Sequence, residues 1–142
     1  MRAKMKRLTF AGIAALGVLA LSAPNASATS KSQGPVKMKM NPNCRVTLYV
    51  DDHQYPGKIR GQAHFTCSKG DNIFTPTIDF FRNGTHVQGK SAGPRTINKD
   101  KGYSFETTIT DASGTQCYQA TLLIIYPLGS ITQNIKTPCL NT

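Results

Sequence analysis

One stretch decides the fold of this chain: Cys117-Tyr-Gln-Ala-Thr-Leu-Leu-Ile-Ile-Tyr126, then Pro-Leu-Gly, then Ser130-Ile-Thr-Gln-Asn-Ile-Lys-Thr-Pro-Cys139. Two strand-like runs flank a short turn, and a cysteine stands at each outer end. If Tyr126 pairs with Ser130 in an antiparallel ladder, Cys117 lies opposite Cys139. Opposed residues in such a ladder lie about 4.5–5.5 Å apart at Cα, which is within the range of a disulfide. The stretch therefore predicts a disulfide-closed hairpin.

A second hairpin is predicted between Cys44 and Cys67. Residues 44–51 and 59–67 alternate apolar and polar side chains, which is typical of half-buried strands, and a turn with Pro56-Gly57 separates them. The register that joins the cysteines also sets apolar residues opposite each other: Val46 and Phe65, Leu48 and Ala63, Val50 and Gly61. A slip of one residue would bury the polar set, so this agreement fixes the register.

The same register predicts an ion pair on the outer face of this hairpin. Asp51 lies opposite Arg60. We expect both side chains at the surface, where such a pair contributes under about 1 kcal/mol.

The four cysteines permit three connectivities. We favour Cys44–Cys67 with Cys117–Cys139. The alternative joins Cys67 to Cys117 and Cys44 to Cys139, which would connect two sheets as in antibody domains. Tryptophan is absent, so the tryptophan that packs on the disulfide of those domains is absent too.

The first 28 residues have the features of a bacterial secretory signal peptide. A basic segment precedes twelve apolar residues at 10–21, and Ala26-Ser27-Ala28 resembles a cleavage site. The apolar run is shorter than the roughly 20 residues of a spanning helix, and no later stretch approaches that length. We expect a secreted, extracellular protein with a flexible leader at 29–43, containing at most one edge strand, and a single domain at 44–142.

We expect seven strands and no helix in that domain. They lie at 44–51, 59–67, 73–82, from 85, and at 102–110, 117–126 and 130–139. Asn83-Gly84 is a strong signal for a tight hairpin turn, and residues 88–101 have the composition of a long loop. The spacing predicts an all-β fold, an antiparallel Greek-key β-sandwich of immunoglobulin-like type, with a small barrel as the alternative.

The strand at 117–126 is apolar on both faces. Alternate residues from Tyr118 to Tyr126 form one apolar face, and Leu123 and Ile125 lie on the other. We expect a central strand that is covered on both sides. If it is not covered, it presents an apolar patch of the kind that marks a partner surface.

The chain is basic, with 17 Lys and Arg against 7 Asp and Glu, a formal charge of +10. Four of the basic residues lie in the predicted signal, so thirteen remain, a surplus of six. Such a surplus favours anionic partners, although it also serves solubility. Export and the lack of a stacking-aromatic motif argue against nucleic acid as the partner.

Motifs of catalysis are missing from the sequence. It has no Gly-x-Ser-x-Gly elbow and no phosphate-binding glycine loop, and all four cysteines are assigned to disulfides. Asp51-Asp52-His53 is better explained as a polar turn than as a metal site, and His64 as a surface residue. We therefore expect no enzyme activity, no cofactor and no metal ion.

Two segments are candidates for binding a partner. Arg82, Asn83 and His86 surround the predicted hairpin tip, and the basic loop contributes Lys90, Arg95, Lys99 and Lys101. Loops on a rigid β scaffold commonly carry binding residues. The basic loop suits an extracellular protein or an anionic envelope polymer, or it is merely solvated.

Cys44-Arg-Val-Thr-Leu-Tyr49 is similar to a segment of small secreted two-disulfide inhibitors, such as the actinomycete α-amylase inhibitors. The similarity covers six residues, and the aromatic-Arg-aromatic tip of those inhibitors is missing, so no functional residue carries over. We expect a small secreted non-catalytic binding module. The alternatives are a secreted inhibitor of a hydrolase and a small extracellular hydrolase whose site the sequence does not reveal. Oligomeric state has no signature in the sequence.

Overall fold

The computed structural model describes residues 29–127, 129 and 131–142, and the predicted signal at 1–28 lies outside them. The described residues form strands and no helix, so none forms a helix of the length and apolar character needed to cross a membrane. The ten strands are β1 Ser30–Lys37, β2 Cys44–Asp51, β3 Lys58–Cys67, β4 Asn72–Arg82, β5 Thr85–Ser91, β6 Arg95–Ile97, β7 Gly102–Thr110, β8 Cys117–Ile125, β9 Thr132–Lys136 and β10 Leu140–Asn141.

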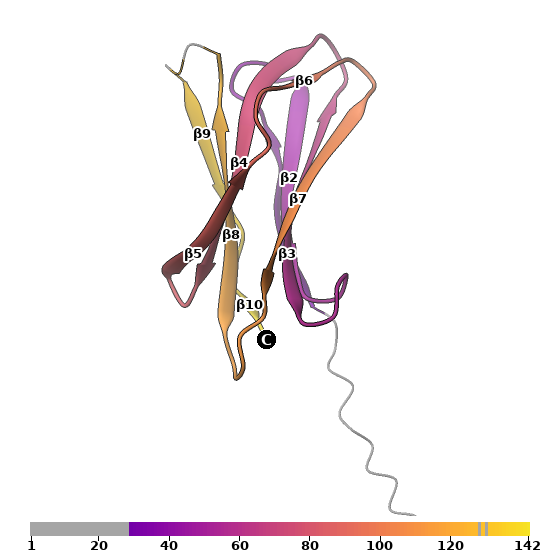
Figure 1. The fold of residues 1–142 in the computed structure, drawn as a ribbon. Coiled ribbons are helices and arrows are strands. Elements are labelled where there is room, and N and C mark those ends of the chain that lie inside the picture. Colours follow the sequence, from indigo (N-terminus) through magenta and orange to yellow (C-terminus); the bar gives the residue numbers. More distant parts are fainter. Residues whose placement is uncertain (1–28, 128, 130) are drawn as a thin grey trace, which may run out of the picture.

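The strands form two antiparallel sheets that face each other (Figure 1). One sheet has the order β1-β2-β3-β7. The other has the order β10-β8-β4-β5, and β6 pairs with β4 while β9 pairs with β8. An all-β fold is confirmed, but the expected number of seven strands is wrong. The three further strands are β1, β6 and β10.

The core lies between the sheets and follows the predicted alternation. Buried residues alternate with more exposed ones along β2, β3, β4, β7 and β8, and most of the buried ones belong to one apolar cluster. A glycine allows the sheets to approach closely, since a Cβ atom added at Gly61 of β3 would lie 2.9 Å from the Phe80 ring of β4. We expect any larger residue there to push the layers apart.

The first predicted hairpin is confirmed pair by pair. β2 and β3 pair with Cys44 opposite Cys67 and Val46 opposite Phe65. The cysteines form a disulfide with a Cα–Cα distance of 4.0 Å. The register was predictable because apolar and polar residues alternate without a break in both strands, so that one register buries the apolar face of each.

The second hairpin has the predicted disulfide but not the predicted register. Cys117 and Cys139 are bonded with a Cα–Cα distance of 5.4 Å, but the residue that pairs with Cys117 in the sheet is Asn141. The ladder is already one residue out of the predicted register in β9, where Ile125 pairs with Thr132, and it shifts by one more residue between Lys136, where β9 ends, and Leu140, where β10 begins. Pro138 lies in this gap, and a proline has no N–H to donate to a ladder.

The hairpin turn at Asn83-Gly84 has the predicted geometry. Both residues have positive φ angles, 50° and 82°, and Arg82 pairs with Thr85. The segment that follows is not a long loop. β5 continues to Ser91 and β6 returns to pair with the start of β4, so the expected loop at 88–101 contains two strands.

The leader at 29–43 contains the edge strand β1, which pairs with β2. Its residues are mostly exposed, so their polar composition did not indicate a strand. β1 lies beside Asp51, and Asp52 binds Thr29 through both backbone and side chain. As a result Asp51 is only 1% exposed, and the expectation of a surface ion pair is wrong.

The strand β8 is buried on its inner face and half-buried on its outer face. Leu123 and Ile125 are therefore only partly covered, contrary to the prediction. β8 lies between β4 and β9–β10, so it is central within its sheet, but no second layer of described residues covers its outer face.

Candidate functional site

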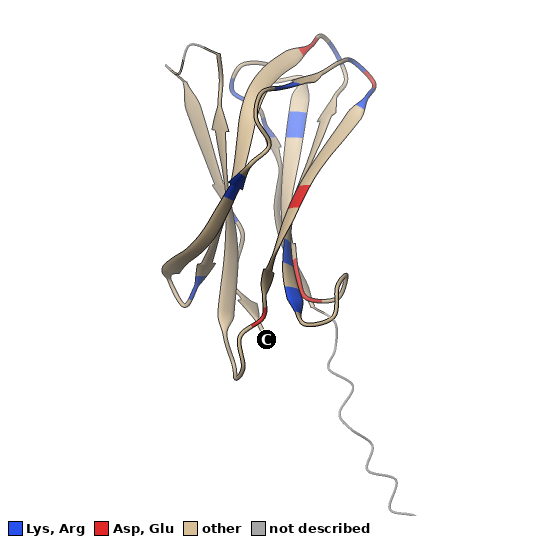
Figure 2. Ribbon diagram, viewed as in Figure 1, with Lys and Arg blue, Asp and Glu red and all other residues tan. Residues whose placement is uncertain are grey.

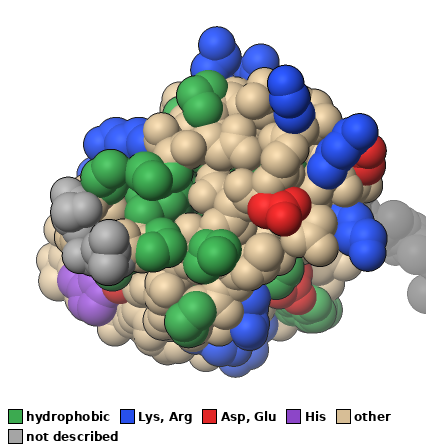
Figure 3. Space-filling view, turned by 90° about the horizontal axis from the view of Figure 1, so that it is seen from above, with side chains coloured by type: hydrophobic (Ala, Val, Ile, Leu, Met, Phe, Trp, Pro, Cys, Tyr) green, Lys and Arg blue, Asp and Glu red, His purple; other side chains and the backbone are tan. Residues whose placement is uncertain are grey.

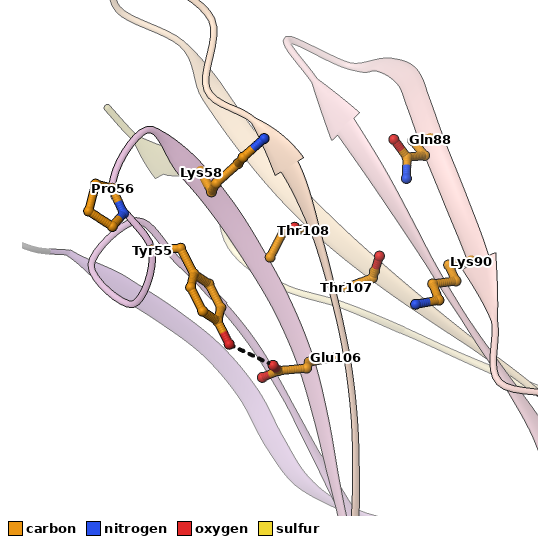
Figure 4. Close-up of a pocket in the computed structure, with 8 residues that line it drawn as sticks. All are labelled: Tyr55, Pro56, Lys58, Gln88, Lys90, Glu106, Thr107 and Thr108. Carbon is orange, nitrogen blue, oxygen red and sulfur yellow. Dashed lines mark hydrogen bonds between the residues drawn. The ribbon is translucent and has the colours of Figure 1, made fainter.

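A cleft lies between β7, the edge of one sheet, and β5, the edge of the other. Its volume is about 690 Å³. Figure 4 shows the side chains that line it. They are Tyr55, Pro56, Lys58, Gln88, Lys90, Glu106, Thr107 and Thr108.

A tight turn between β2 and β3 forms one wall of this cleft. Pro56-Gly57 reverses the chain, with Gly57 at a φ of 66°, and the backbone N–H of Lys58 donates to the Tyr55 carbonyl at 3.1 Å. The Asp111 N–H donates to the Gly57 carbonyl at 3.0 Å, which ties the turn to the end of β7. The turn thereby holds the Tyr55 ring, which is 41% exposed, beside Glu106.

A chain of charged groups organises the acidic side of the cleft. The Tyr55 hydroxyl donates to Glu106 Oε1 at 2.9 Å, and Arg60 Nη1 donates to Glu106 Oε2 at 3.3 Å. Arg60 also donates two hydrogen bonds, of 2.8 and 2.9 Å, to the buried Asp51 Oδ2. The carboxylate of Glu106 is therefore already partnered on both of its oxygens.

These contacts change the proton affinity of two groups. The hydrogen bond to Glu106 and its negative charge raise the pKa of Tyr55 above its ordinary value, so the phenol stays a donor. Burial lowers the pKa of Arg60, but the hydrogen bond and charge of Asp51 outweigh it and raise that pKa. At neutral pH, Arg60 is therefore charged and Tyr55 is protonated, and both donate hydrogen bonds to the Glu106 carboxylate.

The two lysines of the cleft lie on opposite walls. Lys58 donates from Nζ to Thr110 Oγ1 at 3.0 Å, and Lys90 projects from β5; both residues are exposed. Among the described residues, no ion pair involves either of them. The cleft thus presents two exposed ammonium groups beside one carboxylate whose oxygens accept hydrogen bonds from Tyr55 and Arg60.

The predicted hairpin-tip residues Arg82, Asn83 and His86 are not among the residues that line this cleft. His86 Nε2 is 3.0 Å from Asp79 Oδ1, and its ring packs edge-on against Phe81. The Asn83 carbonyl oxygen Oδ1 accepts from the Cys117 N–H at 2.9 Å. Arg82 is half-buried at the end of β4.

The predicted basic segment is not one surface. Lys90 faces the cleft, whereas Arg95, Lys99 and Lys101 lie toward the opposite end of the molecule from the hairpin tip. Arg95 Nε donates to the Tyr103 hydroxyl at 3.1 Å, and Lys99 lies 3.8 Å from Asp100. Figure 2 shows basic positions spread over both ends and along the strands, so sequence proximity did not create a patch.

That opposite end also carries an apolar groove of about 350 Å³. It is lined by Ile73, Phe74, Thr75, Pro94, Ile125, Tyr126 and Pro127. Ile73 is 53% exposed and the nearby Met40 is 51% exposed. Figure 3 shows apolar side chains gathered on this end with basic side chains around them. Of the described residues that line the groove, Thr75 and Tyr126 carry polar side-chain groups, and the Tyr126 hydroxyl is hydrogen-bonded to the Lys39 N–H and to Gln133.

Sequence reasoning missed Tyr55, Lys58 and Glu106. An exposed aromatic in a Pro-Gly turn was a usable signal, because such turns lie at the surface. The partnership of β3 with β7, and the position of β5 across from β7, had no local signal in the sequence.

The histidines do not assemble a site. His64 Nδ1 is 2.8 Å from Ser104 Oγ, and His53 Nδ1 lies 3.6 Å from Asp51 Oδ1. Within residues 29–127, 129 and 131–142, no three His, Cys, Asp or Glu side chains are grouped so as to hold a metal ion.

No known family model matches the chain, and none of the curated proteins compared with it is similar.

Proposed function

We propose that this protein is a small secreted, non-catalytic binding module that holds an anionic partner of the cell envelope or extracellular medium in the cleft between β5 and β7. The observation that carries the proposal is the pair of exposed lysines, Lys58 and Lys90, on opposite walls of one cleft, where their two positive charges exceed the one negative charge of Glu106 among the lining residues.

Three further features support binding over catalysis. Glu106 is held by Tyr55 and Arg60, and a general base needs a carboxylate that is free to accept a proton. The lining supplies hydroxyl, amide and ammonium groups that can donate hydrogen bonds to an anion. Two disulfides suit a scaffold that works outside the cell.

We also propose that the two sheets form an immunoglobulin-like Greek-key sandwich. In support, β3 neighbours β7 in one sheet and β4 neighbours β8 in the other, although each pair is distant in sequence. The chain crosses between sheets from β3 to β4, from β6 to β7 and from β7 to β8, as consecutive strands do in that topology.

One observation favours the second candidate, a secreted inhibitor of a hydrolase. The hairpin tip is anchored, since Asn83 Nδ2 donates to Gln116 Oε1 at 2.6 Å and Asn83 Oδ1 accepts from the N–H of the disulfide-bonded Cys117. A rigid exposed tip is what insertion into an active site requires. Loss of activity of a purified extracellular hydrolase on adding the protein, abolished by Asn83→Ala, would support this function.

Co-sedimentation of the purified protein with whole bacterial cell walls, across a series of salt concentrations, tests the first proposal. We expect binding that falls as salt screens the charges, and a further loss of about tenfold in Lys58→Glu/Lys90→Glu. Lys31→Glu/Lys37→Glu on β1, which lowers the net charge by the same amount, is the control and should bind nearly as the natural protein does. Binding that is indifferent to both salt and the double substitution would reject the cleft as the site.

A further inference from the structure

We infer that the cleft accepts an extended acidic polypeptide segment, which adds to the free edge of β7 as a new strand. This inference rests on the proposed function and specifies the class of partner.

The floor of the cleft is the edge of a strand. Glu106, Thr107 and Thr108 are consecutive in β7, and all three line the cleft. β7 pairs with β3 along one edge, from Gly102 opposite Thr66 to Thr110 opposite Lys58. Along its other edge, no backbone hydrogen bond to any described residue is formed. A strand edge of this kind presents backbone N–H and C=O groups that another chain can pair with.

The space above this edge is open because β5 does not cover it. All seven residues of β5 are exposed, including Gln88 and Lys90 on the wall that faces β7. Between described residues, no hydrogen bond or ion pair joins β5 to β7. The volume of about 690 Å³ lies within the range of about 300–1,000 Å³ that is typical of ligand sites.

The walls select for negative charge. Side chains of an added strand alternate between its two faces, so one set would lie toward Lys58 on the outer face of the sheet and the other toward Lys90 on β5 (Figure 4). The one negative charge of Glu106 is outnumbered by the two lysines among the lining residues, and its oxygens already accept hydrogen bonds from Arg60 and Tyr55. Acidic side chains on either face of the added strand therefore meet a cation.

A polypeptide can pair with the backbone N–H and C=O groups at the free edge of β7 better than an anionic polysaccharide can. The donors and acceptors along a β edge repeat with the spacing of another β strand, so a backbone pairs with all of them in register. A sugar polymer can reach the lysines but lacks this repeat. The lysines provide the charge preference, and the edge of β7 provides the preference for a peptide.

The test is an NMR titration of the ¹⁵N-labelled protein with an eight-residue peptide of alternating Thr and Glu. We expect chemical-shift changes in β5 and β7, and at least fivefold slower hydrogen exchange for amides within 105–110. A peptide of the same sequence with N-methyl groups on alternate residues keeps the charge but cannot pair, and should bind at least tenfold more weakly. The Lys58→Glu/Lys90→Glu variant should no longer bind the acidic peptide. The Lys31→Glu/Lys37→Glu variant, changed on β1, should bind it as the natural protein does.

Three results would overturn the inference. Equal affinity for the N-methylated peptide, or for inorganic polyphosphate, would leave an anion-binding cleft without strand addition, and the proposed function would stand. Protection of β7 amides that rises with protein concentration alone would make the edge a contact between copies of this chain. Shift changes that avoid β5 and β7 for every probe would reject both the inference and the proposed cleft.

Discussion

The edge strands of the two sheets are joined by hydrogen bonds between described residues along one long side of this molecule and not along the other. On the closed side, β1 and the segment Met38–Met40 meet β9, and side chains join them. Gln133 Nε2 donates to the Lys37 carbonyl at 2.9 Å, and the Lys39 N–H donates to both Tyr126 Oη and Gln133 Oε1 at 3.0 Å. On the open side, β5 and β7 are separated by the cleft, and no such bond between described residues crosses it.

The difference shows how a two-layered β fold can combine stability with a site. Where the sheets meet at a buried seam, polar side chains replace the backbone pairing that neither edge strand receives from its own sheet. Where the seam is left open, the strand edges remain available and lysines line the gap. We therefore expect changes on the closed side to lower stability and changes on the open side to alter binding.

The largest effect is expected from the disulfide that ties the β9–β10 segment of the closed side to β8. Cys117→Ser removes a cross-link between residues 22 apart in sequence, and loop-closure entropy puts the loss at about 3 kcal/mol. We expect little stable protein in the medium and a lower urea midpoint for what is recovered. Normal yield with an unchanged melting temperature would contradict this role.

The next effect is expected at the buried amide of the closed side. Gln133 is 7% exposed and takes part in three hydrogen bonds. Gln133→Ala removes the donor to the Lys37 carbonyl and the acceptor of the Tyr126 hydroxyl, and it should cost roughly 1–3 kcal/mol in urea unfolding. Gln54→Ala, at an exposed turn position, is the matched control and should change stability by under about 0.5 kcal/mol. Equal losses of free energy of unfolding in the two variants would show that the hydrogen bonds of Gln133 do not stabilise the closed side.

A smaller effect is expected from ionisation of Tyr126. Burial raises its pKa above the ordinary value of 10.0, even though the Lys39 N–H bonded to its oxygen lowers it. A group whose pKa is raised by folding contributes its stability fully below the unfolded pKa and loses it as the pH rises through the folded pKa. The free energy of unfolding should therefore decline above about pH 10, and the decline should be shallower in Tyr126→Phe. Parallel declines in the two proteins would show that Tyr126 is not responsible.

The smallest effect on stability is expected on the open side. Lys58→Glu and Lys90→Glu change exposed side chains that take no part in an ion pair among the described residues. Each should shift the free energy of unfolding by under about 0.5 kcal/mol, measured by urea titration at neutral pH. A loss of more than 1 kcal/mol would mean that these lysines support the fold, and a change in binding could then no longer be assigned to the cleft alone.

The sequence was sufficient for structure that depends on neighbours along the chain. Alternation and paired cysteines predicted the β2–β3 hairpin to the residue, and Asn83-Gly84 predicted its turn. The same reasoning gave the wrong register between Cys117 and Cys139, because the β8–β9 ladder is one residue off from the turn onward and shifts again at the break that contains Pro138, which the disulfide spans. Paired cysteines report register only where both strands are continuous.

The candidate site could not be predicted in the same way. Of its lining, only Lys90 was expected to bind a partner, and it was expected for the charge of a loop that is in fact a strand. Tyr55, Lys58 and Glu106 are brought to Lys90 by the pairing of β3 with β7 and by the facing of two sheets. These are long-range arrangements that no local pattern specifies.

The most direct test of the account compares the two sides at equal charge. Fluorescence anisotropy with a labelled ten-residue poly-glutamate would give dissociation constants for the natural protein, Lys58→Glu/Lys90→Glu on the open side, and Lys31→Glu/Lys37→Glu on the closed side. Both variants lower the net charge by the same amount. The account predicts at least a tenfold loss of affinity for the open-side variant and less than a twofold change for the closed-side variant. Equal losses would contradict it, because binding would then follow net charge and not the cleft.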